Sequence, residues 1–228
     1  KNHFLHSLND PIFTKIKINY LDAIQEGRTT LEQVEESKNS MTANEFKVFV
    51  ECEFVDGLNN KVFNLDNIKQ LNNYSTNQTY SIGIDIARTG DYTVIIGLDI
   101  NGNMTYSERL PHDSLVLQNE KIKNAIKNFK PQIVHVDQTG LGAGTFDELE
   151  NEFGNIIHGV QFNTAVKKEM VKNLQLLFER KEIGVYDKDN WLIDEILDFE
   201  VRKTPAGIET YGNTYGKNDD GVISLALA

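Results

Sequence analysis

Apolar and polar positions alternate most clearly near the centre of the chain, over residues 80–99. Isoleucines alternate with small or polar residues across 80–86, which predicts a half-buried strand. The β-branched segment 94–96 predicts a return strand after the turn-forming segment 88–91. Asp85 interrupts the first apolar strand, where an unpaired carboxylate is costly to bury. It is therefore either a strand-end residue neutralised by a nearby arginine or backbone amides, or a functional residue beside a cation or an open cleft.

The pattern after residue 80 predicts the order β, β, β, α, β, α, and hence an α/β fold. Asn101 and Gly102 predict a type I′ hairpin turn between strands at about 92–100 and 103–110. The other expected elements are helices over 115–129, 145–153, 164–180 and 191–199, strands over 133–137, 159–162 and 183–186, a hairpin of 200–203 with 207–210, and a helix that begins near 218.

Residues 1–78 predict a mainly helical lead-in to this domain. Alternation over 15–20 predicts one short strand. Capping boxes, with Thr30 ahead of Gln33 and Thr42 ahead of Glu45, predict two helices. A polar segment over 70–78 predicts a linker, so we expect a lead-in of residues 1–78 and a main domain of residues 79–228.

Composition narrows the class of protein. With 228 residues, 39% hydrophobic and 25% charged, the chain has the composition of a soluble globular protein. Its single cysteine, Cys52, excludes an internal disulfide and favours a reducing compartment. It has neither a signal peptide nor a membrane-spanning apolar run, and without a starting Met we expect a fragment. The net charge of −11 argues against a protein that coats nucleic acid, but allows an enzyme that holds DNA over an acidic, metal-filled cleft.

Four acidic residues carry the candidate chemistry: Asp85, Asp137, Asp219 and Asp220. The first two end or interrupt buried strands, and the other two precede the last helix, so one edge of a sheet can collect all of them. Carboxylates that gather there repel one another unless a divalent cation lies between them. Oxygen ligands suit Mg²⁺ or Mn²⁺, and two such ions about 3.5–4 Å apart can promote phosphodiester cleavage. Alternatively, Asp137 caps the glycine-rich loop and Asp219 and Asp220 favour a helix N-terminus.

Other candidates are weaker. The glycine-rich loop at 140–144 suits a phosphate at a helix start, but it lacks the Lys-Ser/Thr of a Walker A loop and equally suits a flexible connection. His135 is more typical of a structural histidine than of a ligand. Lys167, Lys168 and Lys172 are candidates for contacts with DNA phosphates, and a solvated helix face explains them equally well.

These motifs, in this order, resemble the nuclease domain of tailed-phage large terminase subunits. The resemblance rests on Gly-Ile-Asp at 83–85, Val-His-Val-Asp-Gln-Thr-Gly-Leu-Gly at 134–142, and Asn-Asp-Asp at 218–220 ahead of Leu-Ala-Leu-Ala. Met-Thr-Ala-Asn-Glu-Phe at 41–46 and Glu-Cys-Glu-Phe at 51–54 resemble the segment that joins the terminase ATPase to its nuclease. The resemblance covers nearly the whole chain.

The resemblance implies a ribonuclease H-like fold, a mixed sheet flanked by helices. It implies an endonuclease that uses Mg²⁺ or Mn²⁺, as two ions, to cut concatemeric viral double-stranded DNA during packaging in the host cytoplasm, away from any membrane. Asp85 and Asp137 match the first two metal ligands and Asp220 the third, with Asp219 as the alternative. Asn218 stands where many members have histidine. The implied partners are a terminase ATPase domain in the same chain, the portal and the small terminase subunit. ATPase motifs are absent, so this fragment should cut DNA without translocating it.

Three rival hypotheses remain at this stage. A sugar-kinase or actin-like ATPase also begins with a strand that ends in Gly-Ile-Asp, but it needs a second phosphate motif and an adenosine loop that this sequence lacks. A structure-specific junction resolvase would share the fold. A non-catalytic interaction module would neither bind divalent ions nor cleave DNA.

Overall fold

The structure is a computed structural model that describes residues 10–53, 60–87, 92–111, 113–140, 142–204, 207–214 and 217–228. The chain forms two compact units, Lys1–Leu58 and Asn59–Ala228. The expected division after residue 78 concerns the domains of a longer protein and stays a prediction. No helix in the described ranges combines the length and apolar character needed to cross a membrane.

The first unit contains three helices, α2 (Tyr20–Gln25), α3 (Leu31–Ser40) and α4 (Ala43–Phe49). Both predicted capping boxes are confirmed, because Thr30 and Thr42 accept hydrogen bonds from the backbone of the third helical residue. The short strand predicted over 15–20 is wrong: residues 14–19 have no regular structure. Asn19 instead caps α2, since its side chain accepts hydrogen bonds from the backbone amides of Leu21 and Asp22.

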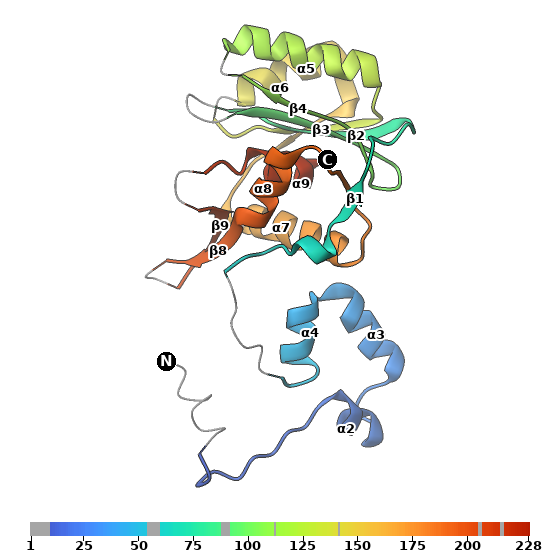
Figure 1. Ribbon diagram of the computed structural model, residues 1–228, viewed down its shortest axis with the longest axis vertical. Helices are drawn as coiled ribbons and strands as arrows, with labels where there is room; N and C mark the ends of the chain where they lie inside the picture. Colours follow the sequence, from blue (N-terminus) through green and yellow to red (C-terminus); the bar gives the residue numbers. More distant parts are fainter. Residues whose placement is uncertain are drawn as a thin grey trace. The chain divides into compact units, whose positions relative to one another are not determined.

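The second unit is built on a five-stranded mixed sheet in the order β4-β3-β2-β5-β6 (Figure 1). The strands β2 (Thr79–Asp85), β3 (Thr93–Asp99) and β4 (Met104–Leu110) run antiparallel to one another. The strands β5 (Ile133–Asp137) and β6 (Ile157–Val160) lie parallel to β2. The predicted α/β class with a mixed sheet flanked by helices is thus confirmed.

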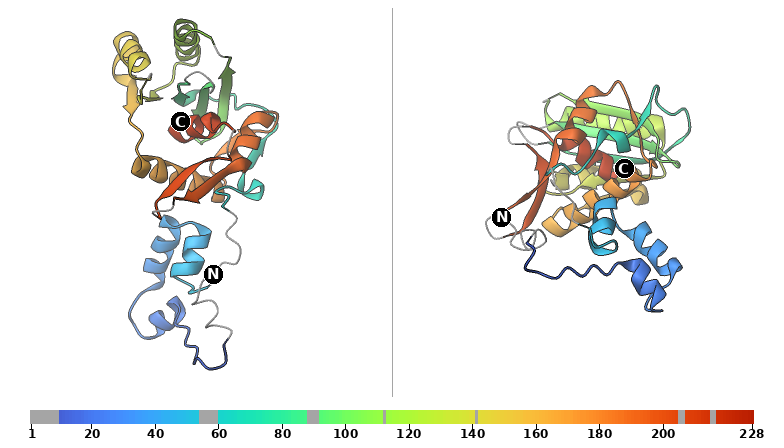
Figure 2. Two further views of the ribbon diagram at one scale, coloured as in Figure 1. Left: turned by 90° about the vertical axis from the view of Figure 1, so that its left-hand side faces the viewer. Right: turned by 60° about the horizontal axis from the view of Figure 1, so that its bottom comes forward.

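Helices cover both faces of the sheet (Figures 1 and 2). α5 (Leu115–Phe129) and α6 (Gly142–Phe153) share one core with the isoleucines of β2. α7 (Thr164–Glu179), α8 (Asn190–Asp198) and α9 (Asp220–Leu227) share the other with β3. The alternation along β2 therefore separates a face of isoleucines from a face of small and polar residues.

Helix α9 lies directly on that second face, at Gly83. The Ser224 hydroxyl donates to the carbonyl oxygens of Gly83, at 2.8 Å, and Val94, at 3.2 Å. A Cβ atom on Gly83 would lie 2.0 Å from the Ser224 carbonyl oxygen. Glycine at this position therefore allows α9 to approach the backbone of β2 closely.

The remaining elements are short: a 3₁₀ turn at Leu65–Asn67, a second at Gly154–Ile156, a parallel pair of β1 (Lys69–Leu71) with β7 (Gly184–Tyr186), and the hairpin of β8 (Phe199–Lys203) with β9 (Glu209–Asn213). The sequence did not predict β1. The type I′ turn predicted at Asn101–Gly102 is wrong: only Gly102 has a positive φ, +75°, and its amide donates to the Asp99 carbonyl oxygen. A type I′ turn needs positive φ at both central residues.

Candidate metal centre

Asp85 and Asp137 end two neighbouring parallel strands. The register pairs Ile84 of β2 with Val136 of β5, and each aspartate is the next residue along its strand. Because the two strands run in the same direction, both carboxylates lie at the same edge of the sheet. The backbone amide of Thr139 donates to Asp137 Oδ1 at 2.7 Å, so part of the capping alternative also holds.

The start of α9 brings Asp219 and Asp220 to the same region. Asp220 is the first residue of the helix and is only 8% exposed. Its Oδ2 atom accepts hydrogen bonds from the backbone amide of Tyr92 at 2.9 Å and from the side chain of Asn218 at 3.2 Å. Asp219 stands just before the helix, but its side chain caps no described amide. The helix-capping alternative therefore does not account for Asp219.

The pKa of Asp85 shows that these carboxylates share one electrostatic field. Burial raises this pKa well above the usual range, and the charges of Asp220, Asp137 and Asp219 raise it further. Within the described ranges, the Asp85 carboxylate has no hydrogen-bond or ion-pair partner. Burial also raises the pKa of Asp137, while its hydrogen bonds with Thr139 oppose the shift. A largely buried carboxylate without a partner, among like charges, is the setting that a bound cation would relieve.

The three predicted DNA-binding lysines all lie on α7 but have different surroundings. Lys167 Nζ lies 2.9 Å from Asp219 Oδ2, so its charge enters the acidic edge. Lys168 Nζ lies 2.6 Å from Glu209 Oε2 on β9. Lys172 is half-buried further along the helix. Contact with DNA stays a prediction for all three.

The sequence analysis missed a buried pair, Arg109 and Glu195, that supports the start of α9. Glu195 Oε2 accepts a hydrogen bond of 2.8 Å from the backbone amide of Gly221. Its Oε1 atom lies 3.2 Å from the Arg109 guanidinium in an ion pair without hydrogen-bond geometry. Burial raises the pKa of Glu195 to about 7, and Asp220 also raises it, while Gly221 and Arg109 lower it. The one available signal was a glutamate inside the apolar helix predicted over 191–199.

Arg109 also stacks over the ring of Tyr92, 3.7 Å from its centroid. The backbone amide of Tyr92 is the group that binds Asp220. One charged pair thus supports Asp220 from two sides, through Tyr92 and through Gly221. A Cβ on Gly221 would lie 2.7 Å from Glu195 Oε2, so glycine is required for this approach.

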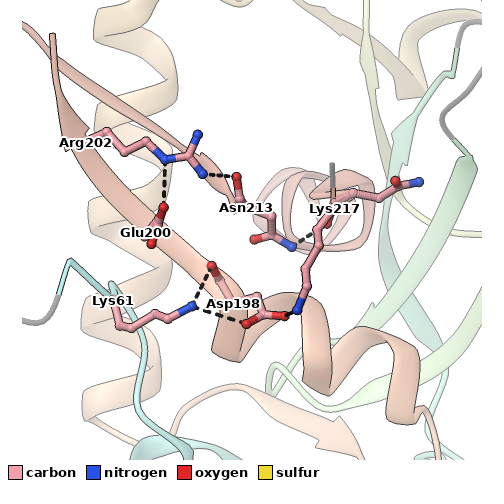
Figure 3. A network of polar contacts seen from close by, with 7 residues as sticks. Lys61, Asp198, Glu200, Arg202, Asn213 and Lys217 are labelled. Atoms are coloured by element: carbon pink, nitrogen blue, oxygen red, sulfur yellow. Dashed lines mark hydrogen bonds and ion pairs between the residues drawn. The ribbon is translucent and has the colours of Figure 1, made fainter. Parts of the chain in front are cut away.

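A second polar network fixes the chain just ahead of α9 (Figure 3). Asp198 accepts from Lys61, at 3.0 Å to its carbonyl oxygen, and also binds Lys217. Arg202 of β8 bonds to the Asn213 carbonyl oxygen, and the Asn213 side chain bonds to the carbonyl oxygen of Asn218. These contacts hold both ends of the segment that leads to Asp219.

The glycine-rich loop and His135 have structural explanations. Gly140 has a φ of +66°, and a Cβ on Gly142 would lie 1.8 Å from the Asp137 carbonyl oxygen, so the glycines let α6 begin against the end of β5. Leu141 lies outside the described residues. His135 pairs across strands with His158, and burial followed by that neighbour lowers its pKa. Neither feature points to a ligand.

The donor set suits a hard divalent cation in its chemistry: it consists of carboxylate oxygens, one of which, on Asp85, is largely buried and unpaired. Among the described residues, however, no three His, Cys, Asp or Glu side chains are arranged so that they could hold one ion as they stand. The site therefore fits such an ion in ligand type and charge, and its side chains must converge further to bind it.

Comparisons with known proteins agree with this arrangement. The family model described as "Terminase RNaseH-like domain" matches residues 82–228. The terminase large subunit of Thermus phage G20c is 29% identical over 157 residues, which are 68% of this chain and 32% of that protein. The matched part thus spans about a third of that relative's length.

Solved structures show the same similarity. The crystal structure of the large terminase nuclease from thermophilic phage G20c with bound magnesium has a TM-score of 0.66 and 26% identity, over 75% of this chain and 97% of that one. The large terminase of a second thermophilic bacteriophage has a TM-score of 0.66 over 91% of this chain and 57% of its own, but at 14% identity it shows the fold alone.

Proposed function

The chain belongs to the terminase RNaseH-like domain family, and from this premise we propose that it is a divalent-metal-dependent endonuclease that cuts concatemeric viral double-stranded DNA during genome packaging. The observation that carries the proposal is the meeting of Asp85, Asp137 and Asp220 at one edge of the sheet, where the buried Asp85 has no described partner. The bound magnesium of the G20c nuclease supports the choice of ion.

Asp85, Asp137 and Asp220 are the proposed ligands of two Mg²⁺ or Mn²⁺ ions. When bound, such ions stabilise the negative charge that develops during phosphodiester hydrolysis. The chain's own part is to orient the carboxylates: the Thr139 amide holds Asp137 and the Tyr92 amide holds Asp220. Asp85 at the end of β2 is fixed by the sheet itself.

Two observations favour Asp220 over Asp219 as the third ligand. Among the charged neighbours that raise the pKa of Asp85, Asp220 has the largest effect and Asp219 the smallest. Asp219 is in addition paired with Lys167. We therefore assign the ion-binding role to Asp220, and expect the loss of its carboxylate to be the more damaging of the two.

Lys168 and Lys172 on α7 are the proposed contacts with DNA phosphates. Their contribution should be modest and salt-sensitive, because the chain as a whole carries a net charge of −11. The ion pair of Lys167 with Asp219 favours a different role for that residue, argued below.

The longer protein supplies the remaining parts of the proposal. We assign residues 1–78 to the segment that joins a terminase ATPase domain to the nuclease domain of residues 79–228. The fold match to the large terminase of the second thermophilic bacteriophage, which includes the N-terminal part of this chain, is compatible with that division. The ATPase in the same chain, the portal and the small terminase subunit are the proposed partners, in the host cytoplasm.

Cleavage of supercoiled plasmid tests the proposal. We expect nicked and linear products with Mn²⁺ or Mg²⁺, little sequence preference, and none in EDTA. Asp85→Asn, Asp137→Asn and Asp220→Asn should abolish cutting, whereas Asp147→Asn, on the exposed side of α6, is the matched control and should leave it intact.

Full activity in the Asp85 or Asp137 variant would contradict the assignment. Selective cutting of four-way junctions over linear duplex would favour a resolvase, and tight binding of ATP an actin-like or sugar-kinase-like domain. A folded protein that neither binds divalent ions nor cleaves DNA would be an interaction module.

A further inference from the structure

Lys167 brings a positive charge into the acidic edge of the sheet. Its ammonium group lies 2.9 Å from Asp219 Oδ2, and its charge lowers the pKa of both Asp85 and Asp137, against the effect of burial. The ammonium also lies 6.0 Å from the ring centroid of the buried Phe199. One lysine of α7 thus acts on carboxylates from β2, β5 and the start of α9.

We propose that Lys167 is an internal counter-ion: in the protein without divalent ions its ammonium group offsets the repulsion among the acidic side chains, and a divalent ion must compete with it for the same carboxylates. This inference rests on the metal site of the proposed function. Lys167 is then a positioning residue that sets the affinity of the ion site. A lysine suits this task because a compact ammonium on a flexible stem withdraws without disturbing the backbone.

The charges at this edge explain why such a residue is needed. Asp85, Asp137, Asp219 and Asp220 raise one another's energy when ionised, and one ammonium relieves part of that repulsion. A divalent ion relieves more of it, but it is itself repelled by the ammonium. The two cations therefore weaken each other's binding reciprocally, as linked ligands must.

The arrangement of the donors is consistent with this competition. Within the described ranges no three metal-binding side chains are positioned to hold one ion. The ion pair with Lys167 engages one oxygen of Asp219, next to the proposed ligand Asp220 in the chain. Withdrawal of the ammonium would free that oxygen and remove a positive charge from the edge.

The neighbouring residue provides a matched control. Lys168 carries the same charge on the same helix, but it pairs with Glu209 and its side chain is 53% exposed, against 28% for Lys167. Substitution of either lysine by methionine removes one positive charge and keeps the length of the side chain. Any general effect of net charge on metal binding appears equally in both variants, so the difference between them isolates the position of Lys167.

The experiment measures Mn²⁺ affinity by isothermal titration calorimetry, without DNA, in the 228-residue chain. We expect Lys167→Met to bind Mn²⁺ about tenfold more tightly than the wild type, and Lys168→Met to change the affinity less than twofold. Lys167→Arg, which keeps the charge, should stay close to the wild type. Lys167→Met should also melt at a lower temperature than the wild type in EDTA, with the difference reduced in saturating Mn²⁺.

The outcomes separate this inference from the function on which it rests. Mn²⁺ binding by the wild type, with Lys167→Met no tighter than Lys168→Met, would overturn the role of Lys167 and leave the metal site standing. A folded wild type that binds no Mn²⁺ would overturn the metal site itself, and this inference with it. If Lys167→Met does not fold in EDTA, Lys167→Gln is measured in its place against the same expectation.

Discussion

Gly83→Ala tests most sharply whether the close approach of α9 to β2 builds the acidic edge. A Cβ at this position would lie 2.0 Å from the Ser224 carbonyl oxygen and 2.5 Å from the Ala228 amide nitrogen, both of which are backbone atoms. Ordinary contact begins near 3.4 Å. The helix must therefore withdraw by about 1.4 Å, since neither backbone atom can rotate away.

The expected losses follow from that displacement. Overpacking of this kind costs about 1–3 kcal/mol, and the hydrogen bond of 2.8 Å from the Ser224 hydroxyl to the Gly83 carbonyl would be weakened as well. We therefore expect the free energy of unfolding to fall by about 3 kcal/mol. Because α9 carries Asp220, a shift on the order of 1 Å should also reduce DNA cleavage by about 100-fold.

The assays are urea denaturation and plasmid cleavage in Mn²⁺. The matched control is Gly144→Ala in α6, where an added Cβ meets nothing within 4 Å and the helical backbone favours alanine. The control should be as stable as the wild type or more so, and as active. Wild-type stability and cleavage in Gly83→Ala would refute the argument that contact between α9 and β2 positions Asp220.

Three further predictions concern pH and charge. Asp85→Asn should stabilise the protein in EDTA at pH 7 while it abolishes cleavage, because burial and like charges raise the pKa of Asp85 in the folded state; the gain should vanish as the pH falls below the ordinary value of 3.8, and melting curves that show no gain at pH 7 would contradict it. Glu195→Gln should remove a loss of stability of about 3 kcal/mol that the wild type undergoes as the pH rises from 4.5 towards 7, because the pKa of Glu195 is raised to about 7; equal pH profiles of denaturation would exclude this. Asp99→Ala should cost about 2 kcal/mol at pH 7, measured in urea, because the hydrogen bonds from Ser75 and its other partners lower the pKa of Asp99 to about 2; the cost should fade as the pH falls from 3.8 towards 2, and a cost that does not depend on pH would count against it.

Much of the fold could be predicted because its signals are local. The isoleucines of β2 and the capping boxes at Thr30 and Thr42 depend only on near neighbours in the sequence. The convergence of Asp85 with Asp137 followed from one further rule, that neighbouring parallel strands end at the same edge of a sheet. The sequence alone could not choose between Asp219 and Asp220, since that choice depends on the position of Lys167 on another helix.

The errors and omissions depend on contacts that are distant in the sequence. β1 and β7 are three residues each and pair across more than a hundred residues, so no local pattern marks them. The alternation over 15–20 has no partner strand among the described residues, and Asn19 directs the chain into α2 instead. Arg109 and Glu195 read as ordinary charged residues until the fold buries them together beside Gly221.

The central claim is that Asp85, Asp137 and Asp220 bind divalent ions together. The most direct measurement is a crystal of this chain soaked in Mn²⁺ and examined for anomalous scattering. The account predicts peaks between the carboxylates of Asp85, Asp137 and Asp220, and their loss in Asp85→Asn. Peaks elsewhere on the protein, or a fully occupied site that survives the substitution, would contradict it.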